Sequence, residues 1–393
     1  MQNYAEHSVF KDENRLSIEY VPQNLPHREK ELGLLELYFK SILDRPGGMS
    51  QRVLICGGIG VGKTVITKLF GARIETRAQR KGINLRYVHV NCRVNKSLFT
   101  VLRRVVDTLN IPFPSRGYSD EELLHSLMKY FDDQNTYLIL ALDELESLIR
   151  EEGSEPLYSL TRFQEERLNG PQRISIICIL RDLLILKTID ESTMSTLQHN
   201  VIDLDKYTHS QLRDILDYRV SEAFWENVVR PDTIQLISDM TSGRGDARYA
   251  IEILWRAGKF ADSEGANEVL PEHARKASAS IYPSIRKETL TFLGLHEILL
   301  LLGIGRKLGQ AESAYITMGE AEEAYRIVCE EYDKKPHGHT KIWECVQELE
   351  DLGIIITKIS GVGMRGKTTL IGIPEVPASI LEKEITRMLE MKE

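Results

Sequence analysis

The sequence predicts an α/β domain with a parallel sheet, followed by a small all-helical domain and then by three helices and a β-hairpin. Short, almost wholly apolar runs alternate with longer amphipathic segments before residue 206, as expected of strands that helices cover on both faces. Segments with helical spacing follow. Beyond residue 286, three helical segments precede two β-prone runs, which is the element order of a winged helix.

The length and composition indicate a soluble protein with more than one domain. The chain has 393 residues, of which 42% are hydrophobic and 27% charged, and this length exceeds what one hydrophobic core usually supports. No run approaches the roughly eighteen apolar residues of a membrane span, and the polar, acidic start does not resemble a signal peptide. We therefore expect a cytoplasmic protein with no membrane partner. The five scattered cysteines lack zinc-ligand spacing.

Four strands are predicted in the α/β domain because each run is rich in β-branched residues and nearly all apolar. They cover 52–58, 83–91, 136–144 and 173–180. Helical segments such as 64–80 and 119–132 lie between them. This alternation is typical of a doubly wound domain.

The stretch GGIGVGKT fits the phosphate-binding pattern G-x-x-x-x-G-K-[ST] and lies between the first strand and the first helix. In that setting, loop N–H groups and a helix N-terminus point at phosphates. Lys63 would pair with the β and γ phosphates, and the Thr64 hydroxyl would ligate Mg²⁺. The alternative is a glycine-rich turn without a ligand. The predicted nucleotide-binding residues of this loop are Gly57, Gly58, Ile59, Gly60, Val61, Gly62, Lys63, Thr64 and Val65.

A second stretch, GVGMRGKT at 361–368, fits the same pattern without the same context. It is followed by a short β-prone run that Pro374 closes, so no helix can begin there. We expect it to be the tip of a hairpin.

The third strand, in LILALDE, ends in Asp143 and Glu144. A carboxylate at the end of a buried strand beside a phosphate loop holds Mg²⁺, and the adjacent Glu144 can orient or deprotonate water. The alternative is a helix N-cap. With the loop, these acids predict a Walker-type ATPase that binds ATP and Mg²⁺ and releases ADP.

Helices are predicted next at 208–224, 231–242, 245–264 and 271–282. Pro231 and Pro271 occupy first-turn positions, where proline is favoured. Arg248, near the start of the third of these helices, could reach a γ-phosphate, although a lone arginine on a helix is usually a solvated charge.

In the last hundred residues, the spacing predicts helices at 290–304, 319–332 and 339–352, followed by the hairpin. The third helix would present polar residues at its N-terminus while its apolar side faces the core. The glycine-rich hairpin is basic and suits DNA phosphates or the minor groove. The alternative is a winged helix that binds protein. The predicted DNA-contacting residues here are His339, Thr340, Lys341, Lys358, Arg365 and Lys367.

The chain resembles the AAA+ initiators of archaeal replication, the Orc/Cdc-six type family. The resemblance lies in NLPHREKEL, GGIGVGKT, ALDELE, RDL, GDARYAIEILWRAG and GLHEILLLLGI, which occur in the family's order from about residue 20 on. It implies an AAA+ base at 21–205, an α-helical lid at 206–285 and a winged helix at 286–393, and the polar sequence before them predicts a tail at 1–20. It also implies ATP-regulated binding of duplex DNA at replication origins, with paralogous initiators and the replicative helicase as further partners.

The resemblance also implies roles for individual residues. Leu25, Pro26, His27 and Arg28 resemble the segment beside the adenine, and Arg248 matches the lid arginine called sensor 2. Related initiators also insert a DNA-contacting helix after the second strand. Here 91–110 has an apolar face at helical spacing, and the candidate DNA contacts are Arg93, Lys96, Arg103 and Arg104. Without the resemblance, these four would be solvated charges.

Two departures from the family pattern matter. In ICILRDL, Arg181 occupies the position where such initiators commonly have a polar Asn, and a cation cannot position water as an amide does. We therefore expect Arg181 to act at the γ-phosphate and hydrolysis to be slow. The stretch 190–197 lacks the arginine that relatives offer to a neighbouring subunit, which disfavours a ring-forming motor. The alternatives to an initiator are an ATP-sensing transcriptional regulator or repressor and, less favoured, a protein-remodelling motor.

Overall fold

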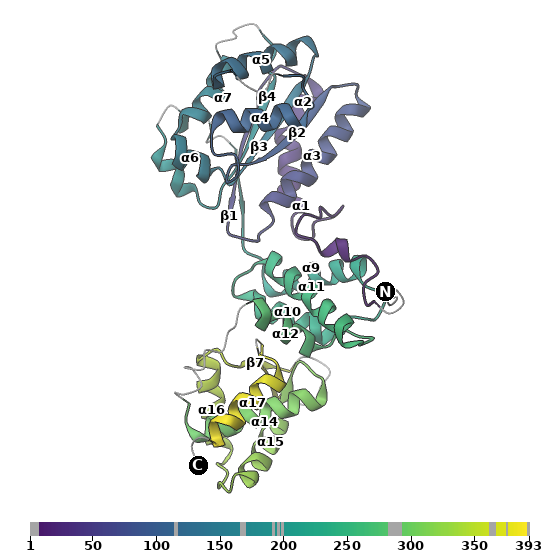
Figure 1. Ribbon diagram of the computed structural model, residues 1–393, viewed down its shortest axis with the longest axis vertical. Coiled ribbons are helices and arrows are strands. Elements are labelled where there is room, and N and C mark those ends of the chain that lie inside the picture. Colours follow the sequence, from purple (N-terminus) through teal and green to yellow (C-terminus); the bar gives the residue numbers. More distant parts are fainter. Residues whose placement is uncertain are drawn as a thin grey trace. The chain divides into compact units, whose positions relative to one another are not determined.

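The computed structural model describes residues 8–113, 117–165, 170–190, 193–194, 197, 200–281, 293–360, 367–374 and 376–390 (Figure 1). The chain divides into two compact units. One is Val21–Tyr207, and the other joins Met1–Tyr20 to Thr208–Glu393. Among the described residues, no helix is long and apolar enough to cross a membrane.

The unit Val21–Tyr207 contains a five-stranded parallel sheet with the strand order β2-β3-β4-β1-β5. Its strands are β1 (Arg52–Gly57), β2 (Leu85–Asn91), β3 (Tyr137–Asp143), β4 (Ile174–Ile179) and β5 (Val201–Leu204). The four predicted strands are confirmed. The edge strand β5 was not predicted, because a run of only four residues carries little pattern.

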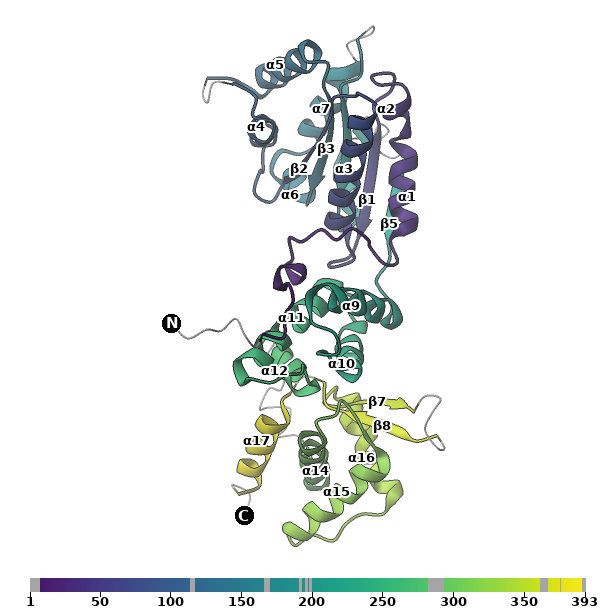
Figure 2. The same ribbon diagram turned by 90° about the vertical axis from the view of Figure 1, so that its right-hand side faces the viewer.

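Helices cover both faces of this sheet, as Figure 2 shows. One layer comprises α1 (Glu29–Tyr38), α2 (Lys40–Asp44) and α3 (Lys63–Arg80), and the other comprises α4 (Leu98–Thr108), α5 (Asp120–Asp133), α6 (Glu146–Glu152) and α7 (Glu155–Glu165). Alternate strand residues serve the two layers: Val53 belongs to the core beneath α1–α3, and Leu54 to the core beneath α4–α7. This two-sided burial explains why the strands are almost wholly apolar.

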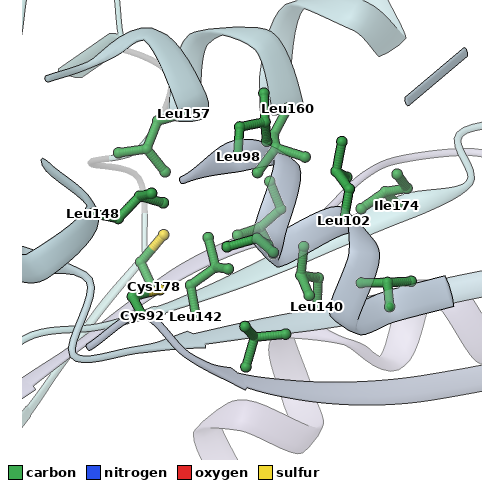
Figure 3. Close-up of a cluster of buried hydrophobic side chains, with 14 of the residues drawn as sticks. Cys92, Leu98, Leu102, Leu140, Leu142, Leu148, Leu157, Leu160, Ile174 and Cys178 are labelled. Atoms are coloured by element: carbon green, nitrogen blue, oxygen red, sulfur yellow. The ribbon is translucent and has the colours of Figure 1, made fainter. Parts of the chain in front are cut away.

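Helix α4 shows the apolar face that its spacing predicts. Ser97 caps its N-terminus in a capping box with Thr100. Figure 3 shows Leu98 and Leu102 packed near Leu140 and Leu142 of β3, within one buried cluster. The packing of α4 therefore fixes which of its residues point outward.

The second unit begins with the four predicted lid helices, α9 (His209–Ala223), α10 (Pro231–Ser242), α11 (Ala247–Glu264) and α12 (Pro271–Ile281). Residues 8–20, predicted as part of a polar tail, instead pack on this helical domain. Val9, Phe10 and Leu16 are buried, and the Phe10 and Phe224 ring centroids lie 4.8 Å apart. These three apolar side chains help to anchor a stretch whose average composition is polar. The average composition therefore gave no sign of this packing.

The rest of this unit is a winged helix. It contains α14 (Leu295–Ala311), β6 (Ile316–Thr317), α15 (Met318–Glu331), α16 (His339–Asp351), β7 (Ile356–Ile359), β8 (Thr369–Gly372) and α17 (Ala378–Glu390). The sheet order is β6-β8-β7, and both pairings are antiparallel. The predicted three helices and hairpin are confirmed, whereas β6 and α17 were not predicted.

The lid and the winged helix share buried contacts within this unit. Arg275 of α12 is 1% exposed. Its guanidinium donates hydrogen bonds to the backbone oxygens of Ile373 (2.8 Å), Ser313 (3.1 Å) and Ala314 (3.0 Å). In addition, Asp239 of α10 accepts a hydrogen bond from the Tyr315 hydroxyl. Two domains that the sequence predicts separately therefore form one compact unit.

Candidate nucleotide-binding site and nucleic-acid interface

The first glycine-rich motif connects β1 directly to α3, which is the context that the sequence predicts. Gly62 precedes α3 with a φ of 98°, a left-handed conformation that favours glycine. A Cβ at this position would lie 3.0 Å from the Tyr207 hydroxyl. The Lys63 Nζ donates hydrogen bonds to the carbonyl oxygens of Gly57 and Gly58 at 2.6 Å each. To bind a phosphate, this ammonium group would exchange those carbonyl oxygens for phosphate oxygens.

Two candidate Mg²⁺ ligands meet at the start of α3. The Thr64 hydroxyl donates a 2.6 Å hydrogen bond to Asp143 Oδ2 at the end of β3. A hydroxyl and a carboxylate in contact are the hard oxygen donors that suit Mg²⁺, so the residues present fit this ion. Burial alone would raise the pKa of Asp143, but hydrogen bonds from His89 and Thr64 outweigh it and hold that pKa below its usual value. Asp143 is therefore an anion at neutral pH.

His89 is a site residue that the sequence did not reveal. Its Nε2 lies 3.1 Å from Asp143 Oδ2, and its Nδ1 lies 3.2 Å from the Tyr87 hydroxyl. Such outer partners orient a metal-binding carboxylate. The observation that identifies His89 is the pairing of β2 with β3, because it places His89 beside Ala141, two residues before Asp143.

Glu144, the predicted general base, has a φ of 52°, a strained backbone conformation for a residue other than glycine. Its Oε1 accepts a 2.7 Å hydrogen bond from Arg181 Nη2, and its Oε2 lies 3.4 Å from Asn91 Nδ2. Arg181 also donates from its backbone nitrogen to the Glu146 carboxylate. Both carboxylate oxygens of Glu144 are thus engaged. Asn91, which the sequence did not single out, aligns with Asp143 in the sheet.

Arg28 binds the backbone of the phosphate loop. It is 4% exposed, and its guanidinium donates to the backbone oxygens of Val61 (3.0 Å) and Asp205 (2.6 Å). The same group lies 4.1 Å from the centroid of the Tyr207 ring. Arg28 therefore positions the loop, and its predicted place beside the adenine, like that of Leu25, Pro26 and His27, stays a prediction.

The structure does not test the predicted roles of Arg248 and of the stretch 190–197. Arg248 is exposed in the first turn of α11, where Asp246 caps the helix, and its γ-phosphate role stays a prediction. Residues 191–192 and 195–196 lie outside the described residues, so the expected lack of a trans-acting arginine also rests on sequence alone.

The candidate recognition helix α16 presents the residues that the sequence predicts. His339, Thr340 and Lys341 are exposed in its first turn, while Ile342 and Val346 are buried. The imidazole of His339 contacts the Glu322 carboxylate. A DNA phosphate would compete with that carboxylate for His339.

The second glycine-rich motif lies between two antiparallel strands, not between a strand and a helix. β7 and β8 pair from Ile356–Gly372 to Ile359–Thr369, and the hairpin continues with a 2.8 Å hydrogen bond from Ser360 N to Thr368 O. The antiparallel strands of the predicted hairpin are confirmed, whereas residues 361–366 of its predicted tip lie outside the described residues. Lys367 is exposed, and Arg365 lies outside the described residues.

Lys358 of β7 is held by the lid. Its Nζ lies 3.2 Å from Asp239 Oδ2 and 3.4 Å from the centroid of the Tyr315 ring. Burial lowers the pKa of Lys358. A DNA contact through Lys358 would first have to break this ion pair, so that predicted role has a structural competitor.

The other predicted DNA contacts lie at and before α4. Arg93 and Lys96 are exposed in the segment before the helix, and Arg104 is exposed on it. The Arg103 Nε lies 3.2 Å from Asp107 Oδ1, one turn later. The apolar side of α4 is buried, so these cations point away from the core, and their contact with DNA stays a prediction.

Three protein families match successive parts of the chain. They are described as an AAA domain (residues 50–181), a Cdc6 AAA+ ATPase-type lid domain (213–279) and a CDC6 C-terminal winged helix domain (288–383). An "ORC1-type DNA replication protein 2" of Saccharolobus solfataricus is 38% identical, over 93% of this chain and 90% of that protein.

Solved structures agree with these matches over almost the whole chain. Cdc6p from Pyrobaculum aerophilum has a TM-score of 0.87 and 32% identity, covering 98% of this chain and 100% of that chain. The Aeropyrum pernix ORC1 protein in complex with DNA has a TM-score of 0.64 and 27% identity, covering 98% of both chains. The Aeropyrum pernix ORC2 protein in ADPNP-ADP complexes has the same score and identity, covering 98% of this chain and 99% of that chain.

Proposed function

The chain belongs to the archaeal Orc/Cdc6 family of DNA replication proteins, and from this premise we propose that it is an ATP-regulated initiator that binds duplex DNA at replication origins. The 2.6 Å contact between Thr64 and Asp143 carries the nucleotide part of the proposal. It joins the phosphate loop to the acidic end of β3, as an ATP–Mg²⁺ site requires. The Aeropyrum relatives with nucleotide or with DNA support both halves of the proposal.

The residues of the site have distinct tasks in this proposal. Lys63 binds the β and γ phosphates, and the backbone N–H groups of the loop surround them. Thr64 and Asp143 hold Mg²⁺, which when bound neutralises the phosphate charge. Arg28 keeps the loop in place through Val61. Arg248 reports from the lid whether a γ-phosphate is bound.

Hydrolysis is proposed to be slow and to act as a switch. Glu144 must accept a proton from the attacking water, yet Arg181 and Asn91 already occupy its carboxylate oxygens. The ATP-bound state would therefore persist long enough to define a DNA-binding conformation.

Origin DNA is proposed to meet the first turn of α16, the β7–β8 hairpin and the outer side of α4. The exposed cations at these places, such as Lys341, Lys367 and Arg104, suit phosphate contacts. Paralogous initiators and the replicative helicase are further proposed partners, from the family alone.

The test is genome-wide footprinting of the bound protein, compared with the positions where replication starts. Protection at replication origins is expected. Protection at promoters and never at origins would refute the initiator proposal and favour a transcriptional regulator.

A further inference from the structure

A cavity beside Glu144 is lined by arginines from three separate segments. Its volume is about 590 Å³, and it is open to solvent. Arg93 comes from the segment before α4, Arg150 from α6, and Arg181 from the turn between β4 and the short helix η2 (Leu183–Thr188). The same cavity is lined by three acidic residues, Glu144, Glu146 and Asp182.

The acidic residues of the cavity already have partners. Glu144 accepts a hydrogen bond from the Arg181 side chain, Glu146 accepts one from the Arg181 backbone, and Asp182 accepts one from Leu184 N at 2.9 Å. Arg93 and Arg150 differ in this respect. Within the part of the chain that the structure describes, neither has a carboxylate at ion-pair distance. Arg93 and Arg150 therefore line the cavity as exposed residues whose guanidinium groups are not paired with a described carboxylate.

We propose that this cavity binds a phosphate group between Arg93 and Arg150. Guanidinium groups bind phosphate through pairs of parallel N–H donors. The phosphate belongs either to a DNA backbone, because Arg93 leads into the predicted DNA-contacting helix, or to free inorganic phosphate. Both have the same oxygen acceptors, and the test below separates them.

A phosphate bound there would also compete with Glu144 for Arg181, since Arg181 lines the same cavity. Glu144 would then be released to accept a proton from water. Occupation of the cavity thus accelerates ATP hydrolysis, a consequence that rests on the proposed ATPase function. Binding of the phosphate itself does not depend on that function.

Binding can be tested with phenylglyoxal, which modifies arginines, followed by peptide mass spectrometry of the full-length protein. Arg93 and Arg150 should be protected by inorganic phosphate, by duplex DNA, or by both. Protection by DNA alone identifies a backbone phosphate, and protection by phosphate alone identifies the free ion. Arg80, exposed at the end of α3, is the control and should be modified equally throughout. Equal modification of Arg93 and Arg150 under all conditions would overturn the proposal.

The Arg150→Ala variant tests the cavity further. Removing one charge-assisted hydrogen-bond donor should raise the ligand concentration that protects Arg93 by about tenfold, whereas Arg80→Ala should leave it unchanged. The ligand should accelerate ATP hydrolysis by the wild type and much less by Arg150→Ala. If the wild type hydrolyses no ATP but the arginines are still protected, the ATPase proposal fails and the phosphate site stands. If the same ligand concentration protects Arg93 in Arg150→Ala as in the wild type, the proposed phosphate site is refuted.

Discussion

Lys63 is the residue whose bonds must change most when a nucleotide binds. Its ammonium group now donates to two carbonyl oxygens of its own loop, and phosphate oxygens are stronger acceptors because they are charged. Lys63→Ala should reduce ATP affinity by at least about a hundredfold, since hydrogen bonds between charged groups contribute about 1.5–3 kcal/mol each. Titration with a fluorescent ATP analogue measures this. Lys68→Ala, five residues later on α3, should bind ATP normally, and unchanged affinity in Lys63→Ala would disprove the loop assignment.

The ion pair between Arg181 and Glu144 is expected to restrain ATP hydrolysis. Because the Arg181 side chain is 51% exposed, its ion pair with Glu144 is worth only about 0.2–1 kcal/mol. Arg181→Asn should therefore raise the rate of ATP hydrolysis by up to about fivefold. Single-turnover hydrolysis gives the rate without interference from product release.

The matched variant Arg181→Lys keeps a cation at this position and should hydrolyse ATP at close to the wild-type rate. A rate in Arg181→Asn below that of the wild type would show instead that Arg181 stabilises the γ-phosphate.

Several site residues could be predicted from the sequence, while their partners could not. The loop and the two acids follow a spaced pattern of residue types, so the sequence alone places Lys63, Thr64 and Asp143 in one candidate site, and the structure brings Thr64 and Asp143 into contact. His89 and Asn91 belong to no such pattern. They meet the acids only because β2 lies beside β3 in parallel register, and pairing between strands far apart in sequence is not encoded by local spacing.

At the scale of elements, the β7–β8 hairpin is expected to bind DNA through its phosphates. Replacing Arg365 and Lys367 together by alanine should weaken DNA binding and reduce the slope of log K against log salt by about 1.8, or about 0.9 for each phosphate contact. ATP affinity should not change. Fluorescence anisotropy with a labelled duplex at several salt concentrations measures the slope.

The exposed Lys383 on α17 provides the control for the hairpin, and Lys383→Ala should keep the wild-type slope. The same slope in the double variant would remove the hairpin from the DNA interface.

Elements with a strong period were predictable, and elements held mainly by their neighbours were less so. The buried strands and the lid helices differ from their predicted bounds by only a few residues. The two-residue strand β6 exists because it pairs with β8, which no local pattern reveals. Helix α17 had a usable signal, since Leu381, Ile385 and Leu389 are buried four residues apart, but it was not predicted.

At the scale of the whole molecule, Arg275 should be among the residues most important for stability. Arg275→Met removes the donor from three backbone oxygens between the lid and the winged helix. Because buried unsatisfied polar groups cost about 1–3 kcal/mol each, the free energy of unfolding of that unit should fall by about 3 kcal/mol or more. Urea denaturation followed by circular dichroism measures the change.

The comparison variant is Arg256→Met, which loses a half-exposed ion pair with Glu252 within α11. Its unfolding free energy should change by less than about 1 kcal/mol. Similar losses in the two variants would mean that Arg275 does not hold the lid and the winged helix together.

The position of Arg275 also decides where the protein can be cut into working fragments. The winged-helix family match begins at residue 288, after Arg275, whereas all three carbonyl groups that Arg275 binds come later in the chain. A DNA-binding fragment that begins at that boundary would lack the Arg275 guanidinium. The three carbonyl oxygens that it binds would lose their donor, and the surface exposed there would be prone to self-association. One that starts at Thr208, where the compact unit resumes, keeps the arginine with its acceptors.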